Sequence, residues 1–315
     1  MPASGNGDRH DRARPRRRRR AGGRSHTQPP CPAVTEGEAE ARADAPAGAA
    51  REIRRLYRRI AMALDLRPGP HIDPLLHRLV HFVVSIPPDH APAILAEPAV
   101  RALRPHLVAL CARAEQELEA AWSAWVSASR VPPLTLLRFP YLDNYRQLTE
   151  LEHTALARHI AHPPRRVLFV GSGPLPLSSL HLAGVLGTGT TIDNLDRGPA
   201  AIAGARRLTH RLDARRLAFH HGDLADLHDL RPYDLVVLAA LVGLTATDKR
   251  RHLHRLRQAM APGAVLLARS AHGLRTLLYP AVHLEDMDGF ELLHVTHPTG
   301  PVLNSTVLAR KPRSR

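Results

Sequence analysis

The chain has 315 residues, of which 44% are hydrophobic, so it is long enough to bury the core of one or two domains. Its formal net charge of +15 does not by itself indicate nucleic-acid binding, because 42 of the 44 basic residues are arginines scattered through the chain, apart from a run at residues 16–20. Two distant cysteines without metal-ligand spacing argue against a disulfide framework or a zinc site, and no apolar run has the length of a membrane span.

Residues 1–48 are rich in Gly, Pro, Ala, Arg and acidic residues and show no apolar periodicity. We therefore expect a disordered basic tail, with its arginine run solvated and not bound to RNA. Glycine and polar residues follow this run in place of the apolar core of an export signal, which predicts a cytoplasmic protein.

Helical spacing of apolar residues begins at position 52 and continues to about position 160 without a strand signal. The pattern predicts a helix ending before the Pro-Gly-Pro at 68–70, a second helix capped by Asp73, a short third helix at 98–103 and a longer one after Pro105. We therefore predict an all-α domain over residues 49–162.

Three polar or aromatic residues of this helical region are candidates for a ligand site. Glu115 lies four residues after Cys111 and three before Leu118, so its carboxylate sits at the margin of the apolar stripe of the long helix. Tyr141 and Tyr145 stand in the segment 139–145, where aromatic rings can cover a ligand or pack on a neighbouring domain. Spacing alone favours a snorkelling surface residue at Glu115 over a carboxylate kept partly desolvated for a function.

The second half is organised around residues 165–178. Four apolar residues at 167–170 predict a strand buried on both faces, which runs into a glycine turn where the backbone can approach a ligand closely. A proline stands where the dinucleotide fingerprint requires its third glycine, and no lysine follows the glycines as in a P-loop. The predicted ligand-binding turn comprises Gly171, Ser172, Gly173, Pro174, Leu175 and Pro176.

Strand and helix signals alternate after this turn, with strands expected at 190–196, 217–221, 233–243 and 262–270 and a closing hairpin over 291–310. This order predicts an α/β fold over residues 163–315, a Rossmann-like domain with a mostly parallel sheet and a C-terminal β-hairpin. Such a layout is typical of S-adenosylmethionine-dependent transferases.

Two acids follow the second and third predicted strands. Asp193 comes 20 residues after Gly173, the spacing of an acid that binds ribose hydroxyls, and we favour it over Asp196. Asp223 is placed to hold the amine of an adenine. The predicted donor-binding residues beyond the glycine turn are Asp193, Asn194, Asp223, Leu224, Ala239, Ala240 and Leu241.

Three cationic or ionisable side chains lie at the end of the fifth predicted strand and just beyond it: Arg269, His272 and Arg275. They are placed to anchor the carboxylates of a donor or an acceptor. A helix cap and surface cations explain them equally well.

Several strings resemble those of the nicotianamine synthase family. They are VGSGPLPL at 170–177, RSAHGLRTLLYP at 269–280, LCARAE at 110–115 and FPYLDNY at 139–145, and the resemblance covers about residues 52–312. It implies transfer of the 3-amino-3-carboxypropyl group of S-adenosylmethionine to an amine, with release of methylthioadenosine and without a metal cofactor. Plant-type members repeat the transfer and cyclise one unit to give nicotianamine. Related bacterial enzymes place one unit on an amino acid such as histidine, as a step towards opine metallophores.

The resemblance also implies roles for single residues. Glu115 matches the helical glutamate that acts as general base, and Tyr145 matches the tyrosine beside the reacting amine. Tyr141, Arg269, His272, Gly273, Arg275 and Tyr279 would bind the substrate. Leu142 and Asp143 depart from the Tyr-Ser typical of plant-like members, so that wall of the pocket is expected to differ.

Other functions remain open at this level. A small-molecule methyltransferase would use the same donor, a non-catalytic S-adenosylmethionine sensor would not need Glu115 and Tyr145, and an RNA-binding protein would act through the basic tail. We expect small-molecule partners, neither nucleic acid nor membrane, and allow for a homodimer.

Overall fold

The computed structural model describes residues 36–313 of the chain, and their side chains from residue 46 onward. The chain from Arg42 onward forms one compact unit. The predicted disordered tail lies outside the described residues as far as residue 35.

The helical half begins earlier than expected, and the predicted cap at Asp73 is wrong, because Asp73 is the first residue of its helix and Ile72 is the N-cap. Its helices are α1 (Glu36–Ala61), α2 (Asp73–Ser85), α3 (Ala91–Ala96), α4 (Pro98–Ala128), α5 (Pro132–Leu136) and α6 (Leu142–His159). Residues 36–48 lack an apolar stripe, and the sequence therefore places them in the tail. Residues 36–48 contain five alanines and three glutamates, which are strong helix formers, and α1 continues through Pro46 in spite of the cost of a proline inside a helix.

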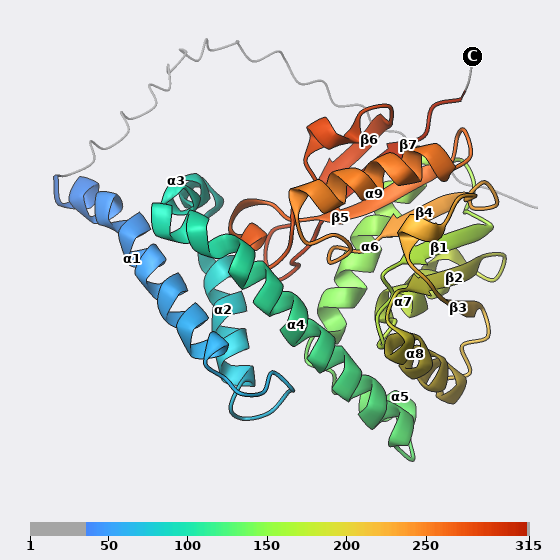
Figure 1. Cartoon of the computed structure of the whole chain (residues 1–315), viewed down its shortest axis with the longest axis horizontal. Helices are drawn as coiled ribbons and strands as arrows, with labels where there is room; N and C mark the ends of the chain where they lie inside the picture. The colour runs from blue at the N-terminus through green and yellow to red at the C-terminus, as the bar shows by residue number, and fades with distance from the viewer. Residues whose placement is uncertain (1–35, 314–315) are drawn as a thin grey trace, which may run out of the picture. The chain divides into compact units, whose positions relative to one another are not determined.

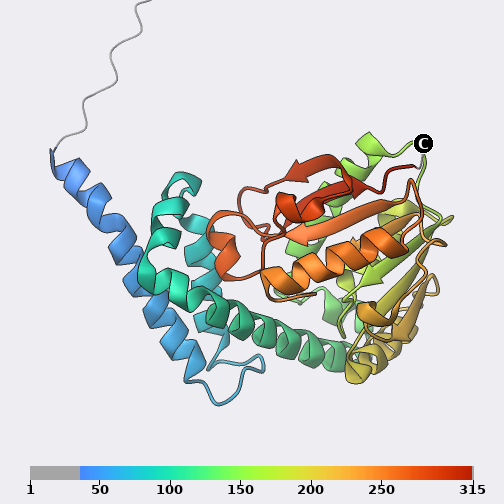
Figure 2. The same cartoon turned by 45° about the horizontal axis from the view of Figure 1, so that its top comes forward.

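Helix α4 replaces the two helices predicted on either side of Pro105. A proline inside a helix costs about 3 kcal/mol, yet Val100 and Leu107 on either side of it are fully buried, so packing outweighs that cost. Figure 1 shows α4 as one continuous helix, and Figure 2 shows its C-terminal half beside α8 (Pro199–Arg211).

A seven-stranded sheet forms the second half, in the order β3-β2-β1-β4-β5-β7-β6. The first five strands pair in parallel, and β7 lies antiparallel between β5 and β6, which confirms the predicted parallel sheet with a closing hairpin. The strands are β1 (Arg166–Val170), β2 (Thr191–Asp196), β3 (Leu217–His221), β4 (Leu235–Leu238), β5 (Val265–Ser270), β6 (Glu291–Thr296) and β7 (Ser305–Arg310).

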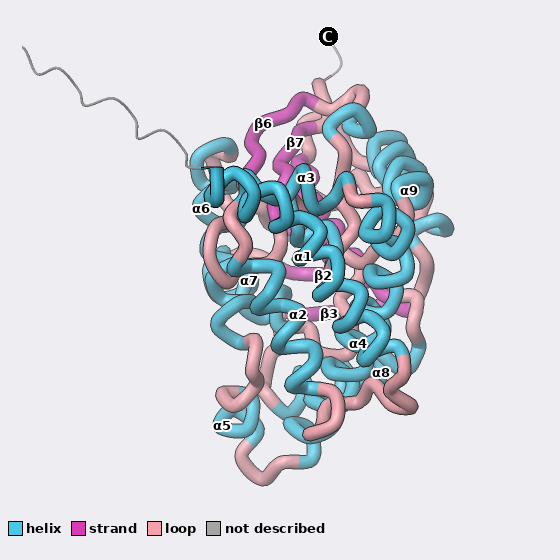
Figure 3. The backbone as a smooth tube through the Cα atoms, turned by 90° about the vertical axis from the view of Figure 1, so that its left-hand side faces the viewer, coloured by secondary structure: helices cyan, strands magenta, loops and turns pink. Residues whose placement is uncertain are grey.

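Helices cover both faces of the sheet, as Figure 3 shows for α6 and α7 (Leu177–Leu186) on one side and α9 (Ala246–Ala259) on the other. Alternate residues of β1 enter the two cores: Val167 and Phe169 pack with Leu182 of α7, whereas Leu168 packs with Leu253 of α9. The central strand is therefore buried on both faces, as its apolar run predicts.

The two halves share a hydrophobic core. Leu274, Leu277 and Leu278, which follow β5, pack with Ile53 of α1 and Leu107 of α4. This shared core brings α4 against the carboxyl ends of the strands, where ligands bind in open α/β sheets.

No single described helix is long and apolar enough to cross a membrane. By length and composition alone, α2 and the segment Pro88–Ala96 together would be long and apolar enough to cross a membrane, with a 94° bend between them.

Candidate functional site

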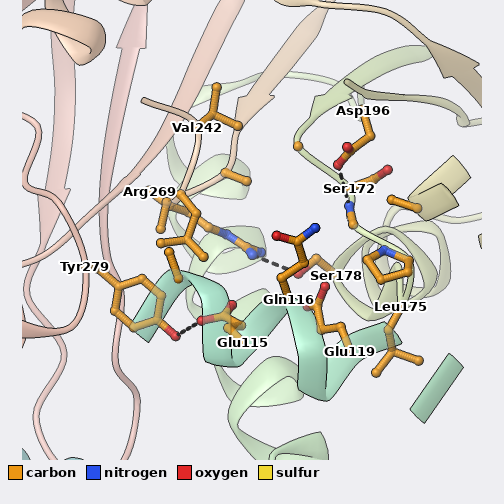
Figure 4. Close-up of a pocket in the computed structure, with 18 of the residues that line it drawn as sticks. Glu115, Gln116, Glu119, Ser172, Leu175, Ser178, Asp196, Val242, Arg269 and Tyr279 are labelled. Atoms are coloured by element: carbon orange, nitrogen blue, oxygen red, sulfur yellow. Dashed lines mark hydrogen bonds between the residues drawn. The ribbon is translucent and has the colours of Figure 1, made fainter. Parts of the chain in front are cut away.

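A cavity of about 690 Å³ lies between the helical half and the carboxyl ends of the strands. It joins the glycine turn after β1 to the face of α4 that carries Glu115, as Figure 4 shows. The predicted site residues that line it are Glu115, Tyr141, Tyr145, Gly171, Ser172, Gly173, Pro174, Leu175, Asp223, Leu224, Ala239, Ala240, Leu241, Arg269 and Tyr279.

The glycine turn requires its glycines. Gly171 and Gly173 have φ values of +82° and +66°, which side chains other than glycine rarely adopt. A Cβ at Gly171 would overlap Val242, and one at Gly173 would overlap the carboxylate of Glu119. The turn therefore packs against the loop after β4 on one side and against α4 on the other. Pro176, the N-cap residue of α7, does not line the cavity.

The acid at the end of β2 is Asp196, which corrects the preference for Asp193. Asp196 lines the cavity, and its Oδ2 atom accepts a hydrogen bond from the backbone N–H of Gly173 at 2.9 Å. The spacing rule fails here because β2 continues to residue 196, and the residue at the carboxyl end of a parallel strand is the one that reaches the ligand crevice.

Asp193 and Asn194 have structural partners away from the cavity. Asp193 accepts hydrogen bonds from Arg166 at 2.9 Å and from the Tyr233 hydroxyl at 3.0 Å. Asn194 is fully buried, accepts from the Ser179 hydroxyl, and donates to the carbonyl of Ala218. Neither lines the cavity, so both donor assignments are corrected.

The two aspartates offer a matched test of the donor seat. We expect Asp196→Asn to weaken S-adenosylmethionine binding about tenfold or more, because hydrogen bonds to an ionised group are the stronger ones. Asp193→Asn should leave that affinity close to the wild-type value. Calorimetric titration of both variants checks this, and equal losses in the two would contradict the assignment.

Two glutamates of α4 each pair with a tyrosine at the cavity wall. Tyr145 donates to Oε1 of Glu119 at 2.7 Å, and Tyr279 donates to Oε2 of Glu115 at 2.6 Å. Figure 4 shows both carboxylates on the side of α4 that faces the glycine turn. The carboxylate that contacts Tyr145 is therefore Glu119 and not Glu115.

Burial raises the pKa of both carboxyl groups. For Glu119 desolvation raises the pKa well above its ordinary value, and the charge of Glu115 one helical turn away raises it further. For Glu115 desolvation again dominates, while the hydrogen bond from Tyr279 and the charge of Arg269 partly offset it. Burial also raises the pKa of Tyr145 and of Tyr279 well above 10.0, so both phenols stay protonated donors near neutral pH. Carboxyl groups with a pKa raised by burial are typical of functional sites.

Glu119 was missed in the sequence analysis, although a signal for it exists. It stands four residues after Glu115 and next to Leu118, so it lies on the same face of α4.

Arg269 lines the cavity but is already occupied by a protein carboxylate. It is buried, and its Nε and Nη2 atoms donate to the two oxygens of Glu152 at 2.7 and 2.9 Å. Its Nη1 atom donates to the Ser178 hydroxyl at 2.7 Å. Arg269 therefore supplies positive charge to the wall and links α6, β5 and α7, and its role as an anchor for substrate carboxylates stays a prediction.

His272, Gly273 and Arg275 do not line the cavity. After β5 the chain turns into a short 3₁₀ helix (Gly273–Leu277), which carries these side chains away and returns Tyr279 to the site. Arg275 donates to the carbonyls of Val302 and Gly300 at 3.0 and 2.6 Å, and His272 stacks on His297 with ring centroids 4.0 Å apart. These three substrate-binding assignments are corrected to structural ones.

Within the described residues no group of three or more His, Cys, Asp or Glu side chains is arranged to hold a metal ion. The cavity instead combines a glycine turn, an acid at a strand end and two carboxylate–phenol pairs, which suits a nucleoside-containing ligand and a protonated amine.

Comparison with known proteins matches this chain to one family. The family model described as "Nicotianamine synthase protein" matches residues 44–315. Nicotianamine synthase 9 of Hordeum vulgare is 45% identical over 254 residues, which cover 78% of this chain and 74% of the relative. Nicotianamine synthase 2 of Arabidopsis thaliana is 39% identical over 265 residues, covering 83% of each chain.

Solved structures show the same fold. The crystal structure of a glutamate-to-glutamine variant of MtNAS superposes with a TM-score of 0.73 at 24% identity, covering 84% of this chain and 98% of that one. MtNAS in complex with MTA and tNA also gives a TM-score of 0.73 at 24% identity, covering 83% and 97%. The extent of the family match and the identity to the plant relatives show that this chain belongs to the nicotianamine synthase family.

Proposed function

We propose that this protein binds S-adenosylmethionine in the cavity, transfers its 3-amino-3-carboxypropyl group to an amine, and makes nicotianamine. The observation that carries the proposal is the cavity that joins the Gly171–Gly173 turn to the Glu119–Tyr145 pair. Relatives named nicotianamine synthase at 39–45% identity support the choice of reaction and product.

The donor is proposed to lie along the carboxyl ends of the strands. Asp196 would bind the ribose hydroxyls, Asp223 would hold the adenine amine, and the loop of Ala239 to Leu241 would form the opposite wall. The glycine turn would leave room for the backbone to contact the donor, because no side chain projects from Gly171 or Gly173.

The Glu119–Tyr145 pair is proposed to prepare the acceptor. An α-amino group is mostly protonated near neutral pH, and its lone pair must be free before it attacks. Glu119 takes the proton, and the Tyr145 hydroxyl, which donates to Glu119, orients the amine beside it. The carboxylate of Glu119 packs against the turn at Gly173, where the donor is proposed to bind.

The transfer itself is a substitution at carbon. The amine nitrogen uses its lone pair to form a bond to the Cγ atom of the methionine moiety, the Cγ–S bond breaks, and sulfur keeps the electron pair as the neutral thioether of methylthioadenosine. The nitrogen then carries the positive charge as a secondary ammonium, and the proton that Glu119 took from the α-ammonium passes to solvent before the next transfer. The positive sulfur makes each of its three attached carbons electrophilic. The position of the amine opposite Cγ therefore selects this reaction over methyl transfer.

One incubation tests the proposal. The purified protein with S-adenosylmethionine alone should release methylthioadenosine and form nicotianamine, both identified by mass spectrometry. Product that appears only after histidine is added would favour a single transfer over nicotianamine synthesis. S-adenosylhomocysteine as the by-product would contradict the proposal and indicate a methyltransferase, and binding without turnover would indicate a sensor.

The cytoplasmic location and the homodimeric state stay predictions from the sequence.

A further inference from the structure

Helix α9 buries a lysine beneath the wall of the donor site. Lys249 is fully enclosed, and its Nζ atom donates to the carbonyl oxygens of Ala240 at 2.7 Å and Ala239 at 3.4 Å. It does not line the cavity, whereas both alanines do. The two carbonyls are therefore bonded to a side chain behind the wall.

The composition of the chain makes a lysine at this place informative. Arginine supplies 42 of the 44 basic residues, and Lys249 and Lys311 are the two exceptions. The planar guanidinium of arginine is larger than the ammonium of lysine. The ammonium concentrates its donors at one point and fits a fully enclosed site. In this arginine-rich chain, a compact ammonium group therefore occupies the place where two adjacent carbonyl oxygens converge.

Lys249 is held by backbone dipoles without an ion pair to any described residue. Burial lowers the pKa of its ammonium to about 7, so the folded chain meets an energetic cost in keeping this group enclosed. A lysine that is buried at such a cost is consistent with a role in fixing the backbone at Ala239 and Ala240.

The loop that Lys249 supports is one of the two loops of the donor site. This loop, residues 239–244, lines the cavity, and Val242 and Ala239 pack against Gly171 so closely that a Cβ there would overlap. Gly243 has a φ of +77° and lies against the backbone of Lys249. A displacement of the loop backbone would therefore directly displace the glycine turn.

We propose that Lys249 is a positioning residue for the donor: by binding the carbonyls of Ala239 and Ala240 it fixes the loop after β4 against the glycine turn and keeps the donor site in its binding geometry. The proposal rests on the proposed function insofar as the ligand is S-adenosylmethionine. It adds a residue that contacts neither donor nor acceptor.

The test compares Lys249→Met with Lys311→Met. Methionine retains most of the aliphatic volume of lysine and removes its donors. Lys311 donates to the carbonyls of Met260 and Gln258 at 2.5 and 3.3 Å, the same kind of contact away from the cavity. Calorimetric titration with S-adenosylhomocysteine, a donor analogue without a transferable sulfonium, measures binding, and methylthioadenosine release measures turnover.

We expect Lys249→Met to raise the Kd for the analogue and the KM for the donor about tenfold or more, with kcat within about threefold of wild type and an unliganded fold intact by circular dichroism. Lys311→Met should behave as wild type. Wild-type affinity in Lys249→Met, or a loss confined to kcat, would overturn the proposal. Should the methionine variant not fold, Lys249→Gln replaces it: its amide NH2 keeps two N–H donors on a shorter side chain, so Kd and KM should rise in the same direction by a smaller factor, and wild-type values would overturn the proposal. Failure of the wild-type protein to bind would instead contradict the proposed function.

Discussion

Glu119→Gln should lower the kcat for methylthioadenosine release about a hundredfold or more while changing donor affinity little. The amide keeps the shape of the carboxylate beside Tyr145 but cannot take a proton from the acceptor amine. Single-turnover kinetics together with calorimetric titration separates the two effects. A variant that keeps wild-type turnover would remove Glu119 from the role of base.

Glu115→Gln is the matched variant one helical turn away. A base acts when it is deprotonated, so the rate should rise with pH through the pKa of the coupled carboxylates. Because the charge of Glu115 raises the pKa of Glu119, its removal should lower that pKa and move the acidic limb of the pH–rate profile to lower pH. Near-complete loss in Glu115→Gln with retained turnover in Glu119→Gln would assign the base to Glu115, as the family resemblance implies.

Glu152→Gln should destabilise the fold by about 3–5 kcal/mol. Arg269 and Glu152 have side chains only 6% and 2% exposed, and the substitution leaves the guanidinium buried without its carboxylate. Urea unfolding of the purified variant measures the free energy of unfolding.

The exposed pair of Arg310 and Glu291 is the control for this second prediction. Their atoms are 3.3 Å apart and their side chains 29% and 54% exposed. Glu291→Gln should cost less than about 1 kcal/mol, because solvent screens such pairs. Similar losses in the two variants would show that burial does not decide the strength of the Arg269 pair.

The sequence predicts the sheet well because the spacing and apolar character of the residues within each strand already indicate a strand and its burial. The run at 167–170 and the glycines after it are local signals, and β1 and its turn form where expected. Asp193 was preferred to Asp196 because a spacing rule cannot say where a strand ends, and the length of β2 decides which acid reaches the cavity.

The acceptor wall was harder to predict because tertiary contacts define it. Glu152 on α6 and Arg269 on β5 are 117 positions apart in the chain, and no local pattern reveals that they bind each other. The same holds for Tyr279 and Glu115. The helical face of Glu119 is a local property, but its contact with the Gly173 turn depends on how α4 packs on the sheet.

The two carboxylates of α4 bear on the order in which products leave. In the proposed reaction the positive charge starts on sulfur and ends on the nitrogen that Glu119 and Glu115 face. The departing thioether is neutral and is no longer attracted to the two carboxylates. The alkylated amine, when protonated, is attracted to them. Negative charge on that side of the chamber favours exit of the nucleoside first and longer residence of the growing chain, an arrangement suited to successive additions without release.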